Sequence, residues 1–296
     1  MKSPTKTRSD QDDDQRRLAV LIDADNAQSS AINGLLEEVA RYGVASVRRI
    51  YGDFTSQQQG GWKKVLLKHS IQPVQQFAYT TGKNATDSAL IIDAMDLMYT
   101  GRFDGFCLVS SDSDFTRLAQ RLREEGLTVY GFGERKTPDA FVQACDKFIY
   151  TEVLRSVAAS PKPEPVSSKP ANKPKKSKRS DLNSLSAATT AAPTSQAAAP
   201  ANEGPPTATG KAAAPLALIQ QAIEEASDEA GWAHLGAVGS YLNKIRPDFD
   251  PRLYGHRKLS DLLKSQAKHF AVEDRGTPGS SAKSVYVRSK GADKGA

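Results

Sequence analysis

Two short apolar runs that each lead into carboxylates constrain the fold of this chain more than any other feature. The first run covers residues 18–22 and ends at Asp23, and the second covers residues 106–109 and is followed by Asp112 and Asp114. Apolar runs of this length with Val and Ile are typical of strands buried on both faces of a sheet. Because ligands of open α/β sheets bind beyond the carboxyl ends of such strands, we expect the acids to line one site.

The rest of the N-terminal half alternates between strand and helix patterns. Strands are expected at residues 18–24, 44–51, 73–79, 106–111, 127–132 and 148–150. Helices are expected between them, including a strong one at residues 86–99. Ser29 or Ser30 is expected to cap the first helix, and Gly43 and Gly126 are expected to end two of the helices. Such alternation predicts an α/β fold whose parallel sheet is joined by right-handed crossovers.

Changes in composition divide the 296 residues. A polar tail is expected at residues 1–16, a first domain at 17–155, a linker at 156–213, a second domain at 214–289 and a short tail at 290–296. The linker is rich in Pro, Ala, Ser, Thr and Lys and has no aromatic residue. A segment of this composition buries too little apolar surface to offset its ordering entropy, so we interpret it as a flexible tether.

Charge and cysteine content indicate the kind of partner and the cellular compartment to expect. The formal net charge is +6 and the isoelectric point about 9.1, which favours a polyanionic partner. A basic run at residues 173–179 is either a weak nucleic-acid contact or a soluble part of the tether. Cys107 and Cys145 lie in apolar or helical patterns, which indicates buried, reduced thiols. With no apolar run near ~18 residues, we expect a cytoplasmic protein without a membrane span.

The second domain shows three helical patterns, around residues 218–223, 235–242 and 259–263, and then two short strands, 270–273 and 284–287. Three helices and a hairpin are the pattern of a small winged-helix, α+β domain. Its basic side chains are candidates for a nucleic-acid face, or else ordinary solvated charges: Lys244, Arg246, Arg252, His256, Arg257 and Lys258.

The helix predicted at residues 86–99 carries an acid on its apolar side. At 100° per residue, Asp87 falls in the middle of a stripe formed by Leu90, Ile91, Ala94, Leu97 and Met98. A carboxylate there is costly unless it has a partner. One interpretation is that Asp87 bonds the free amides at the helix start. The other is that Asp87 leans over the sheet edge toward Asp23 and Asp112.

Four carboxylates would then share one pocket: Asp23, Asp87, Asp112 and Asp114. Like charges this close repel, and a cation relieves the repulsion. Oxygen ligands suit Mg²⁺ or Mn²⁺, and no Cys/His cluster has the spacing of a zinc site. Asn26 could orient a carboxylate or a phosphate, and Lys83 could hold a nucleic-acid backbone. Asp25 and Asp53 are either outer ligands or solvated loop acids, and Asp112 could instead cap the helix that starts near Phe115.

Three sequence blocks resemble those of NYN domains, which are relatives of the PIN nucleases: Leu21–Asn26, Lys83–Asp87 and Ser110–Phe115. The resemblance covers residues 17–154. It implies a Rossmann-like sheet and metal-dependent cleavage of RNA, with Asp23, Asp87, Asp112 and Asp114 at the family's acidic positions.

The second domain is similar to the LOTUS (OST-HTH) module. The similarity lies in Gly231-Trp232 followed by Leu235, in Arg246–Asp250 and in Tyr254–Leu259. It implies binding of RNA, or in some members docking of a helicase, and the pairing of the two domains is typical of these families.

Three functions fit the sequence. The favoured one is a Mg²⁺- or Mn²⁺-dependent endoribonuclease with a tethered RNA-binding module. The second is an RNA-binding adaptor without catalytic activity. The third is a phosphatase of the haloacid dehalogenase type, because Asp23-Ala24-Asp25 mimics its paired acids. That family has Thr or Val two places after the second acid, where this chain has Ala27. The phosphatase hypothesis also gives Asp87 no role.

Overall fold

The computed structural model describes residues 15–55, 59–77, 85–158, 213–276 and 283–290. In the N-terminal domain the strands are β1 (Arg17–Asp23), β2 (Val44–Gly52), β3 (Gln72–Gln75), β4 (Gly105–Val109), β5 (Thr128–Gly133) and β6 (Lys147–Tyr150). The helices are α1 (Ile32–Val39), α2 (Gly60–Leu66), α3 (Ala85–Tyr99), α4 (Thr116–Glu124), α5 (Asp139–Ala144) and α6 (Thr151–Ala158), with 3-10 turns η2 (Ser29–Ala31) and η4 (Ser113–Phe115).

The six strands form one parallel sheet in the order β3-β2-β1-β4-β5-β6. This confirms the predicted α/β fold. The chain moves from β1 outward through β2 to β3, then returns to β4 on the other side of β1. Ligands of such sheets bind where the strand order reverses, at the carboxyl ends of the strands. In this sheet that place lies between the ends of β1 and β4, whose residues Ile22 and Val109 are paired.

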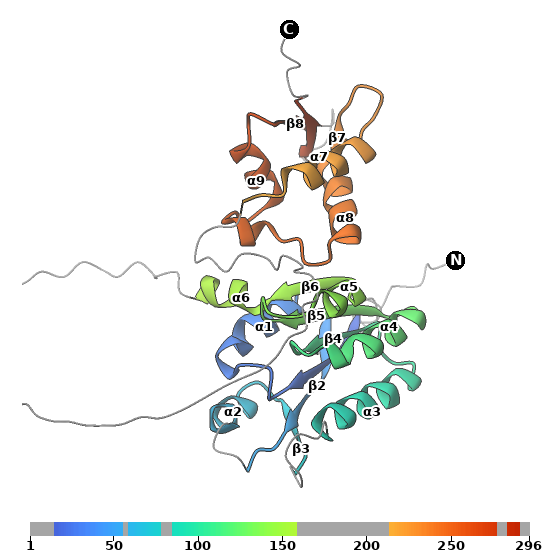
Figure 1. Cartoon of the computed structure of the whole chain (residues 1–296), viewed down its shortest axis with the longest axis vertical. Coiled ribbons are helices and arrows are strands. Elements are labelled where there is room, and N and C mark those ends of the chain that lie inside the picture. Colours follow the sequence, from blue (N-terminus) through green and yellow to red (C-terminus); the bar gives the residue numbers. More distant parts are fainter. Residues whose placement is uncertain (1–14, 56–58, 78–84, 159–212, 277–282, 291–296) are drawn as a thin grey trace, which may run out of the picture. The chain divides into compact units, whose positions relative to one another are not determined.

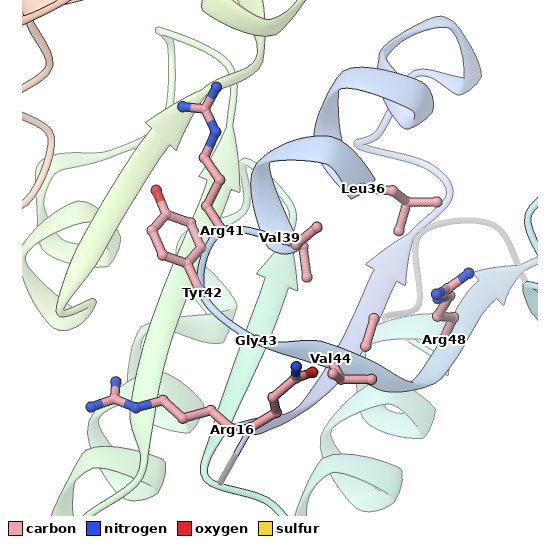
Figure 2. A pocket seen from close by; sticks show the side chains of 11 residues that line it. Arg16, Leu36, Val39, Arg41, Tyr42, Gly43, Val44 and Arg48 are labelled. Carbon is pink, nitrogen blue, oxygen red and sulfur yellow. The ribbon is translucent and has the colours of Figure 1, made fainter. Parts of the chain in front are cut away.

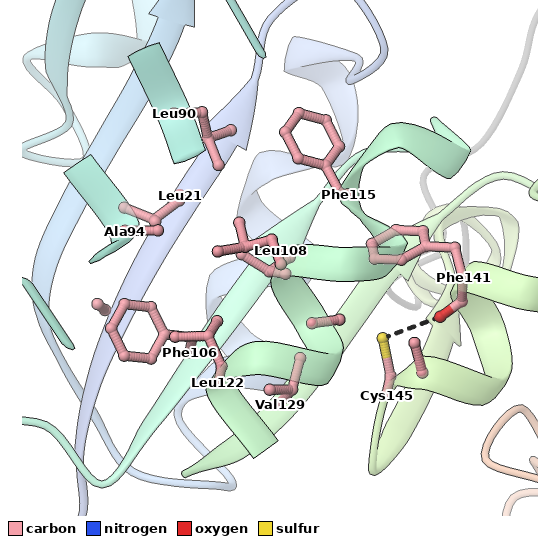
Figure 3. Packing of buried hydrophobic residues seen from close by; sticks show 14 of the residues in the cluster. Leu21, Leu90, Ala94, Phe106, Leu108, Phe115, Leu122, Val129, Phe141 and Cys145 are labelled. Carbon is pink, nitrogen blue, oxygen red and sulfur yellow. Dashed lines mark hydrogen bonds between the residues drawn. The ribbon is translucent and has the colours of Figure 1, made fainter. Parts of the chain in front are cut away.

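Helices cover both faces of the sheet (Figure 1). On one face α3, α4 and α5 pack through apolar side chains onto β1 and β4, and Figure 3 shows this cluster around Leu108, Phe115 and Phe141. On the other face α1, α2 and α6 contribute Leu35, Trp62 and other buried residues. Burial on both faces explains why β1 and β4 are apolar along nearly their whole length.

Two details of the helix ends differ from the predictions. Neither Ser29 nor Ser30 caps a helix, because the chain enters α1 through the 3-10 turn η2, and neither start has a side-chain cap. Gly43 does not end α1 through a left-handed backbone. It is required because a Cβ at this position would collide with the carbonyl oxygen of Arg16. Gly126 does have a positive φ, 80°, as predicted for the residue after α4.

Both cysteines are buried free thiols on the sheet or beside it. Cys107 lies within β4 and Cys145 follows α5, and their side chains are 0% and 1% exposed. Cys145 Sγ donates a hydrogen bond to the carbonyl oxygen of Phe141 at 3.3 Å (Figure 3). Burial raises the pKa of both thiols. The predicted reduced, packed cysteines are therefore confirmed.

The C-terminal domain is a small α+β unit. It contains α7 (Leu216–Glu225), β7 (Ala233–His234), α8 (Leu235–Ile245), a 3-10 turn η5 (Pro251–Tyr254), α9 (Leu259–Ser265), β8 (Phe270–Gly276) and β9 (Lys283–Ser289). The strands are antiparallel in the order β7-β9-β8. Its own apolar core includes Ile223, Leu242, Leu263 and Val287. The predicted three helices and hairpin are confirmed, and β7 adds a third strand.

No helix within the described ranges is long and apolar enough to cross a membrane.

Candidate functional site

Asp23 is the buried centre of the site, with 0% of its surface exposed at the end of β1. Its Oδ1 accepts hydrogen bonds from the backbone amides of Asp25 at 3.0 Å and Asn26 at 3.4 Å. Its Oδ2 accepts from Asn26 Nδ2 at 2.8 Å and from Ser110 Oγ at 2.8 Å. Four donors therefore stabilise a carboxylate that would otherwise be costly to bury.

Ser110 links the two acid-tipped strands, and the sequence did not single it out. Its hydroxyl lies just after β4, donates to Asp23 and accepts the backbone amide of Asp112 at 3.1 Å. Asp112 in turn caps η4, since its Oδ1 accepts the amide of Asp114 at 2.9 Å. The capping role proposed as an alternative for Asp112 is thus present. It uses one carboxylate oxygen and leaves room for a second function.

Three acids converge at the mouth of the site. Asp87, in the first turn of α3, places a carboxylate oxygen within 4.8 Å of one from Asp112 and one from Asp114. Asp87 and Asp112 are half-buried and Asp114 is exposed. Asp23 is not part of this group of three, but its charge reaches the group. The pKa of Asp87 is raised to about 6, most of all by burial and then by the charges of Asp23, Asp112, Asp114 and Asp25.

The predicted position of Asp87 is explained by the packing of α3. Leu90, Ala94 and Met98 are buried against the sheet, on the helix face that the periodicity indicated. This packing fixes the rotation of the helix and carries Asp87 to the sheet edge. The prediction that Asp87 approaches Asp112 is confirmed by their distance, whereas a direct approach to Asp23 is seen only as an electrostatic effect.

The donor set fits a hard divalent cation. All three converging groups are carboxylates, and Mg²⁺ at ~2.0–2.1 Å from each ligand holds neighbouring oxygens roughly 3–4 Å apart. Oxygens already within 4.8 Å of one another reach that geometry by small side-chain movements. Burial raises the pKa of Asp87 most, and the neighbouring carboxylates raise it further; a cation would relieve the repulsion among them.

A cavity of about 540 Å³ lies beside Asp25, on the α2 side of β1. Asp25, Gln59 and Trp62 line it, together with residues 27–30. Gln59 is buried and donates through Nε2 to Asp25 Oδ1 at 2.9 Å, an interaction that sequence reasoning missed because Gln59 belongs to no periodic pattern. Asp53 is held by Gln75 Nε2 at 2.8 Å and by Thr55, as expected for a structural loop acid.

A slightly larger cavity, about 570 Å³, lies at the opposite end of the strands (Figure 2). Arg16, Arg41, Tyr42 and Val44 line it near the start of β2. Figure 2 shows the side chains of Arg16, Arg41 and Arg48 pointing in different directions rather than toward one centre. Because the acids and the carboxyl ends of the strands lie elsewhere, this cavity is not the candidate site.

The predicted substrate contacts have different outcomes. Asn26 is placed beside Asp23, where its amide orients the carboxylate. Lys83 lies outside the described residues. Arg257 and Lys258 are exposed at the start of α9 in the C-terminal domain, so their role in binding stays a prediction.

Comparison with protein families identifies the class. A profile of the NYN domain matches residues 17–154, and a profile of the OST-HTH/LOTUS domain matches residues 211–281. Together they account for more than half of the chain, which therefore belongs to the NYN-domain proteins that carry an OST-HTH/LOTUS domain. NYN domains are a PIN-like nuclease family and OST-HTH/LOTUS domains bind RNA, so the matches support a nuclease with an RNA-binding module.

No curated protein matches the chain. Among solved structures, an uncharacterised protein of Nitrosomonas europaea is 49% identical over 32% of this chain and 89% of its own, with a TM-score of 0.26. A fragment of a Chromobacterium violaceum protein is 33% identical over 28% and 86%, with a TM-score of 0.23. A Vibrio parahaemolyticus protein of unknown function is 18% identical over 47% and 94%, with a TM-score of 0.40.

Proposed function

We propose that this protein is a metal-dependent endoribonuclease whose C-terminal domain binds the RNA substrate. The observation that carries the proposal is the convergence of Asp87, Asp112 and Asp114 at the carboxyl edge of an NYN-type sheet. In this assignment the three acids hold Mg²⁺ or Mn²⁺. Such an ion activates a water molecule and stabilises the charge that develops on a phosphodiester during hydrolysis.

Asp23 has a supporting role in this proposal, which differs from the direct ligand role predicted from the sequence. Both of its oxygens already accept hydrogen bonds, and the residue has no exposed surface. Its fixed negative charge adds to the attraction for the cation, and its hydrogen bonds hold Ser110 and hence Asp112 in place. Groups of this kind, behind the ligands, commonly tune metal affinity.

The other candidate residues are assigned to binding RNA. The cavity beside Asp25 and Gln59 is the place for a nucleotide next to the cleaved bond. Lys83 is proposed to contact the backbone, and Arg257 and Lys258 to contribute positive charge in the second domain. A reducing compartment such as the cytosol fits the free thiols.

The adaptor hypothesis is the second candidate, because Asp112 also has a structural role as a cap. In that case the C-terminal domain would recruit RNA or a protein such as a helicase without turnover. The phosphatase hypothesis is disfavoured, since a nucleophilic Asp23 would need an exposed oxygen.

Cleavage of single-stranded RNA by the purified chain tests the proposal. Activity should require Mg²⁺ or Mn²⁺, stop with EDTA and return when the metal is restored. Asp87→Asn and Asp112→Asn should lower the rate by orders of magnitude. Asp261→Asn, which changes an exposed acid in α9, is the matched control and should retain the wild-type rate. If the chain binds RNA but does not cleave it under any metal condition, the adaptor hypothesis is supported instead.

A further inference from the structure

The outer face of the C-terminal sheet gathers aromatic rings and guanidinium groups. Val287 and Ala233 point into the core with 0% exposure, so alternation along the strands places their neighbours on the opposite face. Tyr286 on β9 pairs with His234 on β7 and with Glu273 on β8. Residues two positions away on the same face complete the set: Trp232, Arg275 and Arg288.

The guanidinium groups of the two arginines lie over the rings. The Arg275 guanidinium carbon is 4.5 Å from the centroid of Trp232 and 4.7 Å from that of Tyr286. That of Arg288 is 5.0 Å from Trp232. Stacking of this kind restricts an otherwise flexible side chain while its N–H groups remain able to donate. Less entropy is then lost when those groups bind an anion.

The loop before β7 fixes the central ring. Asp228 Oδ1 accepts the amides of Ala230 at 3.0 Å and Trp232 at 2.9 Å. Gly231 has a φ of 74°, and a Cβ there would lie 3.6 Å from Cδ of Arg288, in ordinary contact. His234 meets Tyr286 edge-on at 5.5 Å between centroids. The rings are therefore held in place, although Trp232 and Tyr286 are only partly buried.

Charge on this face favours an anionic partner. Two arginines are opposed by one acid, Glu273, whose Oε2 accepts from Arg275 Nε and Nη2 at 3.2 Å. Nucleic acid offers both phosphates for the guanidinium groups and flat bases for the rings. Bases are available for stacking only in single strands, since a duplex hides them.

We propose that Trp232, Arg275, Tyr286 and Arg288, the aromatic–arginine face, bind single-stranded RNA. The arginines contact phosphates, and bases stack on the exposed parts of Trp232 and Tyr286. The inference depends on RNA being the substrate in the proposed function, and it places the RNA-binding surface of the second domain on its sheet. The sequence pointed instead to the helical side, at Arg257 and Lys258.

A matched pair of double variants tests this placement in the full chain. Binding of a fluorescein-labelled, unstructured RNA 12-mer is followed by anisotropy in EDTA, with the RNA checked for integrity on a gel. Arg275→Ala with Arg288→Ala should weaken binding about tenfold or more and reduce the salt dependence, d log K/d log[salt], by about 1.4. Arg257→Ala with Lys258→Ala removes the same charge from the same domain and should have a smaller effect.

Tryptophan fluorescence gives an independent measurement. RNA should quench the emission of Trp232, so Trp232→Phe should remove that part of the response. A Trp62→Phe chain, which lacks the buried tryptophan beside the cavity of Asp25 and Gln59, should keep it. Arg275→Lys with Arg288→Lys keeps the charge and the fold but loses planar stacking, and should bind with intermediate affinity. Circular dichroism establishes that each variant is folded.

The outcomes separate this inference from the proposed function. If wild type cleaves RNA and the Arg275/Arg288 variant binds RNA with unchanged affinity, the inference alone is overturned. The same holds if both double variants weaken binding equally, or if RNA does not quench Trp232. Selective weakening in a chain that never cleaves would support the inference and refute the nuclease. A chain that binds no RNA would overturn both.

Discussion

Ser110 Oγ donates a 2.8 Å hydrogen bond to Oδ2 of Asp23 across 87 positions of sequence. The bond joins the carboxyl end of β4 to that of β1. Since the same hydroxyl accepts the amide of Asp112, the position of this proposed metal ligand depends, through Ser110, on the buried Asp23.

Replacing this hydroxyl should therefore affect both stability and activity. Ser110→Ala leaves Asp23 with fewer donors and should lower the free energy of unfolding by about 1–3 kcal/mol. Cleavage should fall roughly 10–100-fold, the usual effect of removing a group that supports metal ligands. Urea unfolding and a cleavage assay measure the two quantities. Ser46→Ala, which changes an exposed serine on β2 of the same domain, should match wild type in both.

Asp112→Asn should separate the metal-binding role from the capping role. Asn can still accept the amide of Asp114 and so preserve the cap of η4. Without metal the variant should be at least as stable as wild type, because repulsion with Asp87 and Asp114 is reduced. Mg²⁺ should raise the melting temperature of wild type more than that of the variant. Equal shifts in the two proteins, with cleavage intact, would show that Asp112 is structural only.

Asp87 should make the metal-free protein less stable as the pH rises. Its pKa in the folded state is about 6, above its usual 3.8, so the folded protein holds a proton that the unfolded chain releases. The free energy of unfolding should therefore fall between about pH 4 and pH 6, and stay lower above that window. Melting temperatures in EDTA across this range should decline more in wild type than in Asp87→Asn. Parallel pH profiles would refute the raised pKa of Asp87.

The nuclease domain should fold without the second domain. Residues 17–158 contain two apolar clusters of their own, and Val153 and Leu154 on α6 belong to the buried set. A chain ending after Ala158, at the end of α6, should be folded by circular dichroism and should cleave RNA with a raised KM, because the tethered domain no longer concentrates RNA near the site. A chain ending before α6 should be less stable. An unfolded 1–158 chain would contradict the division into domains.

Local pattern was sufficient to predict most of the fold. The apolar runs at β1 and β4 are visible in the sequence, and so is the apolar stripe with Leu90, Ala94 and Met98 on α3, from which the position of Asp87 follows. The strand β7 has only two residues, and α6 follows β6 directly and runs into the Pro- and Ala-rich segment, so both were missed. The role of Gly43 depends on a distant carbonyl, that of Arg16, and no local rule could indicate it.

The site was harder to predict because it depends on strand register. The pairing of Ile22 with Val109 places Ser110 beside Asp23, and this bond uses the last acceptor capacity of Asp23 Oδ2. The sequence showed four equivalent acids. Only the geometry distinguishes the three acids that converge, Asp87, Asp112 and Asp114, from the buried Asp23.

The burial of Cys107 and Cys145 has a practical consequence for site-specific labelling of this protein. Neither thiol is accessible, and burial raises the pKa of each, so little reactive thiolate forms. Thiol-directed fluorophores or spin labels should therefore attach selectively to a cysteine introduced on the surface, in an otherwise native sequence. One such cysteine in each domain would allow energy transfer or electron paramagnetic resonance to follow the separation of the domains as RNA is bound and released.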